Sequence, residues 1–291
     1  MKLSEINIRD PFILTYEDKY YMYGSRVGQP YEGSMWGDQY GFDVYESDDL
    51  ENWSAPKCIF EKNDGFWGEY HFWAPEVHMY KGKFYLIATF KAKGRCRGTH
   101  VLVCDTPNGT FVPISENPAT PLDWECLDGT LYIDKKGKPH LVFCHEWLQI
   151  DNGTVCEVEL SDDLSRAVSE PRELWDAKSY PNVKAITKKG TGFVTDGPFF
   201  YRCENGELLC IWSTHDKDTG YVELVCKSSN GDIDGDWVLL DKPLFDKDGG
   251  HGMIFTDLGG NLRFVMHSPN TILLERPRIV SLFDKDGCLS I

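Results

Sequence analysis

The sequence lacks the features that mark membrane proteins and nucleic-acid-binding proteins. No stretch reaches the roughly 18 consecutive apolar residues of a membrane-spanning helix, and the opening MKLSEINIRD has no apolar run typical of a signal peptide. Basic residues are few, with 30 Lys and Arg against 46 Asp and Glu, so the net charge is -16. Nucleic acids and anionic membranes are bound through clustered Lys and Arg, and we therefore expect neither as a partner.

Cysteine pairs of the kind that bind zinc or carry out redox chemistry are also missing. The chain has ten cysteines, and none of them forms a Cys-x-x-Cys pair. Most stand singly in apolar runs, where a free cysteine behaves as a small buried hydrophobe. These are Cys104, Cys126, Cys144, Cys156, Cys210 and Cys226. We therefore expect reduced cysteines, no zinc site and a cytoplasmic location.

Long helical patterns and cofactor motifs are absent too. No amphipathic stripe of about 12 or more residues occurs, which argues against a helical fold. The segment KKGTG at 188–192 lacks the spacing of a P-loop, and neither a G-x-G-x-x-G nor a G-x-S-x-G motif is found. Aromatic residues make up 13% of the chain and strand formers are frequent, so the composition favours an all-β fold.

What the sequence does contain is a repeat. Five segments consist of a turn or Pro step, an apolar strand, a polar turn and a second strand, which predicts a β-hairpin in each. They begin at Asp10, Pro75, Asp128, Asp196 and Gly250. Further short strands lie between them, as in FDVYESDDLENW at 42–53. Five units of about four strands, spaced about 50 to 70 residues apart, predict one five-bladed β-propeller domain over residues 1–291. A β-sandwich would need no such phased repetition.

The repeat places charged residues at corresponding positions of the five units. These positions are Asp10, Glu76, Asp128, Asp196 and His251. The innermost strands of a propeller surround a central channel, so side chains at one phase should converge at one end of it. Four acids and an imidazole in one pocket destabilise a fold unless something neutralises them. The pattern therefore predicts either a catalytic site that shares protons or a bound cation.

These residues resemble glycoside hydrolase family 43, the five-bladed propeller hydrolases of arabinose- and xylose-containing glycans. The resemblance covers essentially the whole chain and rests on RDP at Asp10, WAPE at Glu76, TDGP at Asp196 and GGHGM at 249–253. It implies that Asp10 is the general base and Asp196 the general acid. It also implies that Glu76 orients the acid and raises its pKa. Inverting hydrolysis needs an ionised and a protonated carboxyl group roughly 6.5 to 9.5 Å apart.

Two of these three positions depart from the family pattern. Glu76 is one methylene longer than the usual Asp, and Asp196 is one methylene shorter than the usual Glu. A shortened acid would fall about 1 Å short of the family position, and loose placement lowers catalytic rates strongly. Glu146 in HLVFCHEW is therefore the alternative acid.

Other residues near these motifs are candidates for binding substrate or metal. The aromatic side chains of Trp73, Trp147, Trp36 and Phe72 would stack on a sugar face, with core packing as the alternative. Asp128 and Arg276 are candidate polar contacts to substrate, and an ion pair is the alternative role of Arg276. The resemblance implies that His251 contacts a calcium ion or its water, although calcium prefers oxygen ligands and His251 would otherwise have a structural role.

We predict an inverting, exo-acting hydrolase that cleaves α-L-arabinofuranosyl or β-D-xylosyl linkages in plant-type oligosaccharides. It would require no cofactor, with calcium in the central channel as an optional ion. Three alternatives remain. The segment WECLD at 124–128 is similar to a motif of family 32 fructan hydrolases and would make Glu125 the acid, but their W-M-N-D-P-N-G segment is absent. A phosphorylase would need a basic phosphate pocket. A catalytically silent carbohydrate-binding propeller would tolerate both altered acids.

Overall fold

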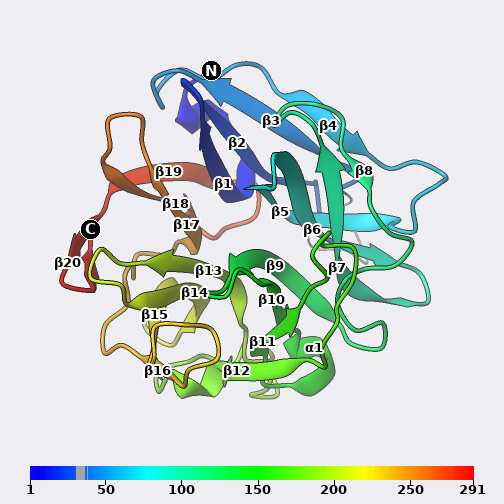
Figure 1. The fold of residues 1–291 in the computed structure, drawn as a ribbon. Coiled ribbons are helices and arrows are strands. Elements are labelled where there is room, and N and C mark those ends of the chain that lie inside the picture. Colours follow the sequence, from blue (N-terminus) through cyan, green and yellow to red (C-terminus); the bar gives the residue numbers. More distant parts are fainter. Residues whose placement is uncertain (31–36, 38) are drawn as a thin grey trace.

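Five antiparallel β-sheets surround a common axis in the computed structural model, which describes residues 1–30, 37 and 39–291 (Figure 1). The predicted five-bladed propeller is confirmed. Each blade is a simple meander, because every strand pairs with the next one along the chain. The inner strands β1, β5, β9, β13 and β17 each contact the following one, and β17 contacts β1, so the ring is closed.

The blades have these bounds. The first contains β1 (Ile8–Tyr16), β2 (Lys19–Arg26), β3 (Gly41–Ser47) and β4 (Lys57–Glu61). The second contains β5 (Tyr70–Tyr80), β6 (Lys83–Ala92), β7 (Arg95–Cys104) and β8 (Val112–Pro113). The third contains β9 (Cys126–Ile133), β10 (Pro139–His145), β11 (Thr154–Glu159) and β12 (Arg172–Asp176). The fourth contains β13 (Asp196–Arg202), β14 (Leu208–Asp216), β15 (Gly220–Ser228) and β16 (Trp237–Leu239). The fifth contains β17 (Gly250–Thr256), β18 (Leu262–Ser268) and β19 (Arg276–Ser281).

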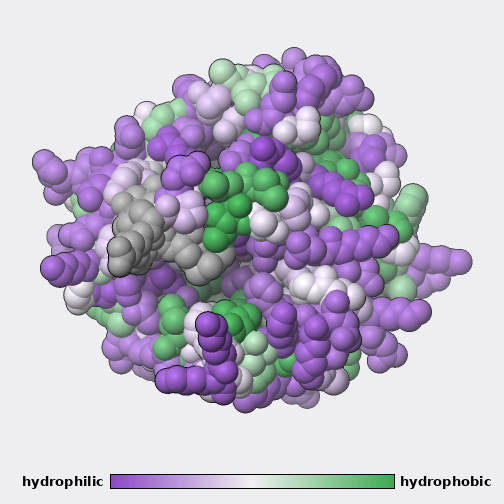
Figure 2. All heavy atoms as spheres, turned by 180° about the vertical axis from the view of Figure 1, so that it is seen from behind, coloured by the Kyte–Doolittle hydropathy of each residue, from purple (hydrophilic) through white to green (hydrophobic). Residues whose placement is uncertain are grey.

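The remaining elements are short. A hairpin of β20 (Phe283–Lys285) and β21 (Cys288–Ser290) follows the last blade. Helical turns occur at η1 (Leu3–Glu5), α1 (Trp147–Ile150) and η2 (Ala177–Ser179). Within the described ranges, no helix has the length and apolar character needed to cross a membrane. On the face turned away from the reader in Figure 1, hydrophilic side chains cover most of the surface, and apolar ones form small groups (Figure 2).

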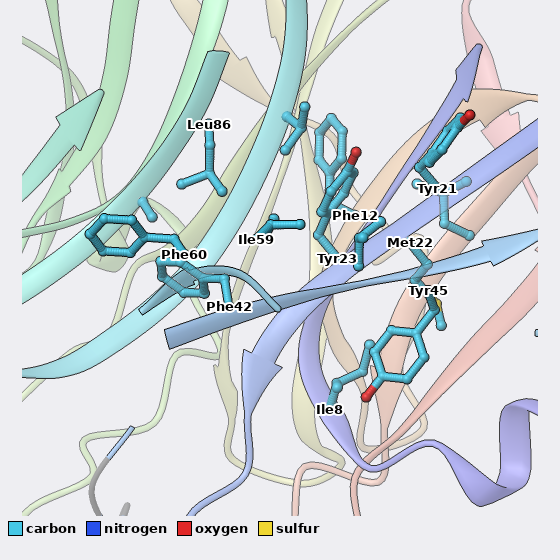
Figure 3. Packing of buried hydrophobic residues seen from close by; sticks show 14 of the residues in the cluster. Ile8, Phe12, Tyr21, Met22, Tyr23, Phe42, Tyr45, Ile59, Phe60 and Leu86 are labelled. Carbon is cyan, nitrogen blue, oxygen red and sulfur yellow. The ribbon is translucent and has the colours of Figure 1, made fainter. Parts of the chain in front are cut away.

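Aromatic residues fill the space between the first two blades (Figure 3). Phe72 is fully buried there, 5.9 Å from Phe60 and 4.8 Å from Phe90 between ring centroids. Burying one such side chain contributes about 1.5 to 3 kcal/mol to stability. The prediction that Phe72 stacks on a sugar is therefore wrong, because none of its ring is accessible.

Polar contacts hold the seam between the last blade and the first. Arg276 donates hydrogen bonds from Nε to the carbonyl of Ser4 at 2.9 Å and from Nη1 to the carbonyl of Glu275 at 2.7 Å. Asn7 donates to the same carbonyl of Glu275 at 2.7 Å. Arg276 thus joins the fifth blade to the N-terminal segment. Backbone carbonyls occupy Nε and Nη1, which gives Arg276 a structural role in the seam, and its contact with substrate stays a prediction.

Candidate active site

Each inner strand carries a β-bulge near its beginning, and the bulges place five residues at equivalent positions. Every bulge contains a residue with positive φ: Asp10 (51°), Ala74 (46°), Asp128 (56°), Gly197 (50°) and His251 (50°). Positive φ is uncommon for residues other than glycine and persists only where the surroundings enforce it. Bulges re-aim side chains and are frequent beside active sites. The repeated strain therefore marks this end of the channel as a functional site.

Side chains from neighbouring blades hold these bulges in place. In four of the five junctions, the bulge N–H group is bound by a side chain on the second strand of the preceding blade. These bonds run from Asp10 N to His267 Nδ1 (3.2 Å), Ala74 N to Ser25 Oγ (2.6 Å), Asp128 N to Thr89 Oγ1 (2.9 Å) and His251 N to Ser213 Oγ (2.7 Å). In the third blade the equivalent residue is Cys144, and Gly197 N donates instead to Oδ2 of Asp128 at 3.2 Å.

His251 lies between two buried carboxyl groups. Its Nδ1 is 3.2 Å from Oδ1 of Asp10 and 3.7 Å from Oδ2 of Asp128. Burial alone would lower the pKa of His251, but the surrounding carboxylates, with Asp10 and Asp128 the strongest, raise it to about 9. His251 is therefore an imidazolium at neutral pH, and it supplies the positive charge that this acidic cluster requires.

Asp10 is held in its ionised form. Burial opposes ionisation, but the charges of His251 and Arg9 outweigh it and keep the pKa of Asp10 below its ordinary value. The Ser25 hydroxyl also donates to Oδ2 of Asp10 at 2.6 Å. A buried carboxylate with these partners is ionised at neutral pH and can accept a proton from water.

The pKa of Asp196 is shifted in the opposite direction to that of Asp10. It precedes the bulge of the fourth blade, and its Oδ2 accepts a hydrogen bond from the Tyr221 hydroxyl at 2.8 Å. Burial is the largest influence on the pKa of Asp196 and raises it, against the opposing effects of His251 and Tyr221. Asp10 and Asp196 therefore differ in proton affinity as a base and an acid must.

Asp128 occupies the place beside the acid that the sequence assigned to Glu76. Its carboxylate binds the N–H of Gly197, the residue after Asp196, and burial raises the pKa of Asp128. Glu76 lies two residues beyond the bulge residue Ala74, which is about 7 Å further along the strand. Its Oε2 is 2.7 Å from Nε2 of His78. The predicted pairing of Glu76 with Asp196 is therefore corrected. In the second blade, Ala74 occupies the bulge position that Asp10 and Asp128 occupy in theirs, and Glu76 lies two residues further along the strand.

Two other carboxylates are neutralised by basic side chains. Glu146, the alternative acid, forms a buried ion pair with Arg97; burial raises the pKa of Glu146 above its ordinary value, and the charge of Arg97 opposes that increase without cancelling it. Glu125 binds Lys91 Nζ at 2.5 Å, and its pKa is lowered by Lys91 and the Arg97 backbone despite burial. A carboxylate paired with a permanent cation is a poor proton donor. The geometry thus favours Asp196 over both.

The aromatic residues predicted to stack on a sugar occupy different positions in the fold. Trp73 directly precedes the bulge of the second blade, donates from Nε1 to Gln39 at 3.1 Å and stacks on His71 at 4.3 Å. Trp147 begins α1, and its ring packs against the backbone of Gly192. Trp36 lies outside the described residues. Trp73 is therefore the aromatic candidate that the fold places beside the bulge.

Calcium does not fit the residues around His251. In the described part of the chain, no group of three or more His, Cys, Asp or Glu side chains is arranged to hold a metal ion. His251 as an imidazolium would repel a calcium ion and could not coordinate it. We assign no step to calcium, and a water-bridged ion elsewhere in the channel stays a prediction.

Sequence reasoning missed the residues that support the site. Ser25, Thr89, Ser213 and His267 each lie opposite the residue that precedes a bulge. Each is the first polar residue after a run of apolar residues in the second strand, and that change was the available signal. Tyr221 was missed because nothing in its strand indicates that the hydroxyl reaches Asp196.

Comparisons with known proteins agree with the fold. The sequence pattern of Glycosyl hydrolases family 43 matches residues 3–280. The chain is 25% identical over 290 residues to the extracellular exo-alpha-(1->5)-L-arabinofuranosidase ArbA of Cellvibrio japonicus, covering 90% of this chain and 74% of that protein. It is 26% identical to the extracellular endo-alpha-(1->5)-L-arabinanase 1 of Bacillus subtilis, but this match spans only 40% of the chain and 41% of that protein.

A solved structure shows the same relationship over 99% of the chain. The endo-arabinase from Bacteroides thetaiotaomicron VPI-5482 has a TM-score of 0.90 and 39% sequence identity, covering 99% of this chain and 98% of that one. The fold, the acidic channel end and the match over residues 3–280 lead to one conclusion. This chain belongs to glycosyl hydrolases family 43.

Proposed function

We propose that the chain hydrolyses α-L-arabinofuranosyl linkages in short arabinose oligomers, with inversion at the anomeric carbon. One observation carries this proposal: at the same end of the channel, the pKa of Asp10 is lowered and that of Asp196 is raised. Inverting hydrolysis requires such a pair, one carboxylate that accepts a proton and one carboxylic acid that donates one.

In the proposed reaction, Asp10 takes a proton from a water molecule as the water oxygen bonds to the anomeric carbon. The bond from that carbon to the leaving oxygen breaks, and Asp196 gives its proton to that oxygen. Asp128 holds the backbone beside Asp196 by accepting the N–H of Gly197, and the negative charge of Asp10 favours the protonated form of the acid. His251 keeps Asp10 ionised without entering the reaction.

The relatives support arabinose as the sugar. Two curated relatives and the cited solved structure are named as an arabinanase, an arabinofuranosidase and an endo-arabinase. β-D-Xylosyl linkages are the second candidate, because a further relative, 24% identical over half of this chain, is named "Xylosidase/arabinosidase 43A". The names include both exo- and endo-acting enzymes. The exo action predicted from the sequence therefore stays a prediction.

The test is a comparison of initial rates on α-1,5-linked arabino-oligosaccharides, linear arabinan, 4-nitrophenyl α-L-arabinofuranoside and 4-nitrophenyl β-D-xyloside. Proton NMR of the first product formed should show the inverted anomer, and Asp10→Asn serves as the inactive control. Release of arabinose alone supports exo action, whereas an early ladder of oligomers supports endo action. Binding of oligosaccharide without turnover of any of these substrates would favour the silent carbohydrate-binding propeller.

A further inference from the structure

A fully buried acid outside the reacting pair is linked to His251. Glu223 lies on β15 and has no accessible surface. Its Oε2 accepts hydrogen bonds from the Ser213 hydroxyl at 2.7 Å and from the N–H group of Gly252 at 3.2 Å. Its Oε1 has no hydrogen-bond partner within the described residues. A buried carboxyl group with an unpaired oxygen destabilises the fold, so its presence calls for a role beyond packing.

We propose that Glu223 is a positioning residue that holds the His251 imidazole between Asp10 and Asp128. It acts through two links, because Ser213 Oγ accepts the N–H of His251 at 2.7 Å and the carboxyl group binds the N–H of Gly252 directly. This inference rests on the proposed function, in which His251 keeps Asp10 ionised.

The junction of blades four and five differs from that of blades one and two in the acceptor of the serine hydroxyl. At the junction of blades one and two, the Ser25 hydroxyl that binds the bulge also donates to Asp10, a member of the site. At the junction of blades four and five, the Ser213 hydroxyl donates to Glu223 instead. Two consecutive N–H groups of the fifth bulge are therefore tied to the fourth blade.

The double anchor matters because the His251 backbone is strained. Its φ of 50° is strained for a residue other than glycine and persists only where neighbouring groups enforce it. The imidazole also packs against Gly197, where an added Cβ would lie 2.6 Å from the ring. A small rotation of the bulge would therefore move Nδ1 away from Asp10.

The experiment compares Glu223→Ala with Glu223→Gln. The amide keeps an oxygen that can accept from Ser213 and Gly252, whereas alanine removes both acceptors. We expect kcat on the arabinoside to fall about 100-fold for Glu223→Ala with KM nearly unchanged, and to stay within about threefold of wild type for Glu223→Gln. Glu157→Gln is the matched control, since Glu157 is a buried acid bound to His140 and Arg172 in the third blade. It should lower Tm without lowering kcat.

A second readout does not depend on turnover. The imidazole N–H of His251 should give a low-field proton NMR signal, assigned by its absence in His251→Asn. We expect the signal in wild type and Glu223→Gln, and its loss in Glu223→Ala. If Glu223→Ala does not fold, Ser213→Ala breaks the same link and should give the same losses. Without turnover in wild type, the proposed function fails but the NMR comparison still decides on Glu223. A Glu223→Ala protein that keeps the signal, or a Glu223→Gln protein as impaired as Glu223→Ala, would overturn the positioning role.

Discussion

Nδ1 of His251 lies 3.2 Å from Oδ1 of Asp10, and each group shifts the pKa of the other toward its charged form. Their contact joins the fifth blade to the first across the seam of the ring. The proposed base is therefore ionised because of how the propeller closes, and perturbing either residue should be visible in the pH dependence of the enzyme.

Asp10→Asn should abolish turnover, with a loss in kcat of about 10³-fold, since an amide cannot accept the proton from water. In wild type, kcat/KM should not decline between pH 7 and about 5, because the pKa of Asp10 lies below its ordinary value of 3.8. Initial rates across this range check both statements. A decline with a midpoint above pH 5 would contradict the lowered pKa.

Asp196→Asn should reduce activity on arabino-oligosaccharides by about 10² to 10⁴-fold, because a sugar alkoxide leaves poorly without a proton. The loss on 4-nitrophenyl α-L-arabinofuranoside should be far smaller, since nitrophenolate is a stable anion. Glu146→Gln is the comparison, and its effect should be similar on both substrates. If Glu146→Gln instead shows the dependence on the leaving group, the acid belongs to the third blade.

Tyr221→Phe should move the alkaline limb of the pH–rate profile to higher pH. The Tyr221 hydroxyl donates to Asp196 and lowers its pKa, so removing the hydroxyl raises that pKa and keeps the acid protonated further into the alkaline range. The profile of kcat/KM against pH gives the midpoint directly. An unchanged limb, or one displaced to lower pH, would argue that Asp196 is not the group that titrates there.

Gly197→Ala should inactivate the enzyme, while Gly206→Ala should not. Both glycines have positive φ, so alanine introduces backbone strain of about 1 kcal/mol or more at either position. Only at Gly197 would the new Cβ strike the His251 ring, because nothing lies within 4 Å at Gly206. Both variants should lower Tm, Gly197→Ala more strongly because of the clash, and only Gly197→Ala should lower kcat. Full activity in Gly197→Ala would show that the ring can shift without consequence.

The stability of the protein should fall as pH rises from about 6.5 to about 9. The pKa of His251 is raised from 6.5 to about 9 in the folded state, so its stabilising contribution is complete below the unfolded value and is lost through that interval. The raised pKa values of Asp128 and of Glu223, the latter about 8, act in the same direction, since the folded state binds the extra protons. Thermal unfolding at half-unit pH steps tests this, and a Tm that rises through the interval would refute it.

Local patterns in the sequence were sufficient to predict the five hairpins and the all-β architecture. Alternating apolar residues and short polar turns are local signals, and each is sufficient to predict a strand or a turn without knowledge of its neighbours. The same local signals identified Asp10, Asp128, Asp196 and His251, because each adjoins a Pro or Gly step at the start of an inner strand.

Which of these side chains contact one another depends on how the blades pack in three dimensions. Glu76 also adjoins a Pro step, but its position along the inner strand relative to the site depends on bulges in the pairing of β5 with β6. The partners of the bulges, such as Ser213 and His267, are distant in sequence and become neighbours when the ring closes. Contacts between blades are not encoded in any local pattern, because they depend on strand register and on the positions of the adjacent sheets. The burial of Phe72 and the contact of Arg276 with Ser4 could not be predicted from the sequence for the same reason, since both follow from packing between blades.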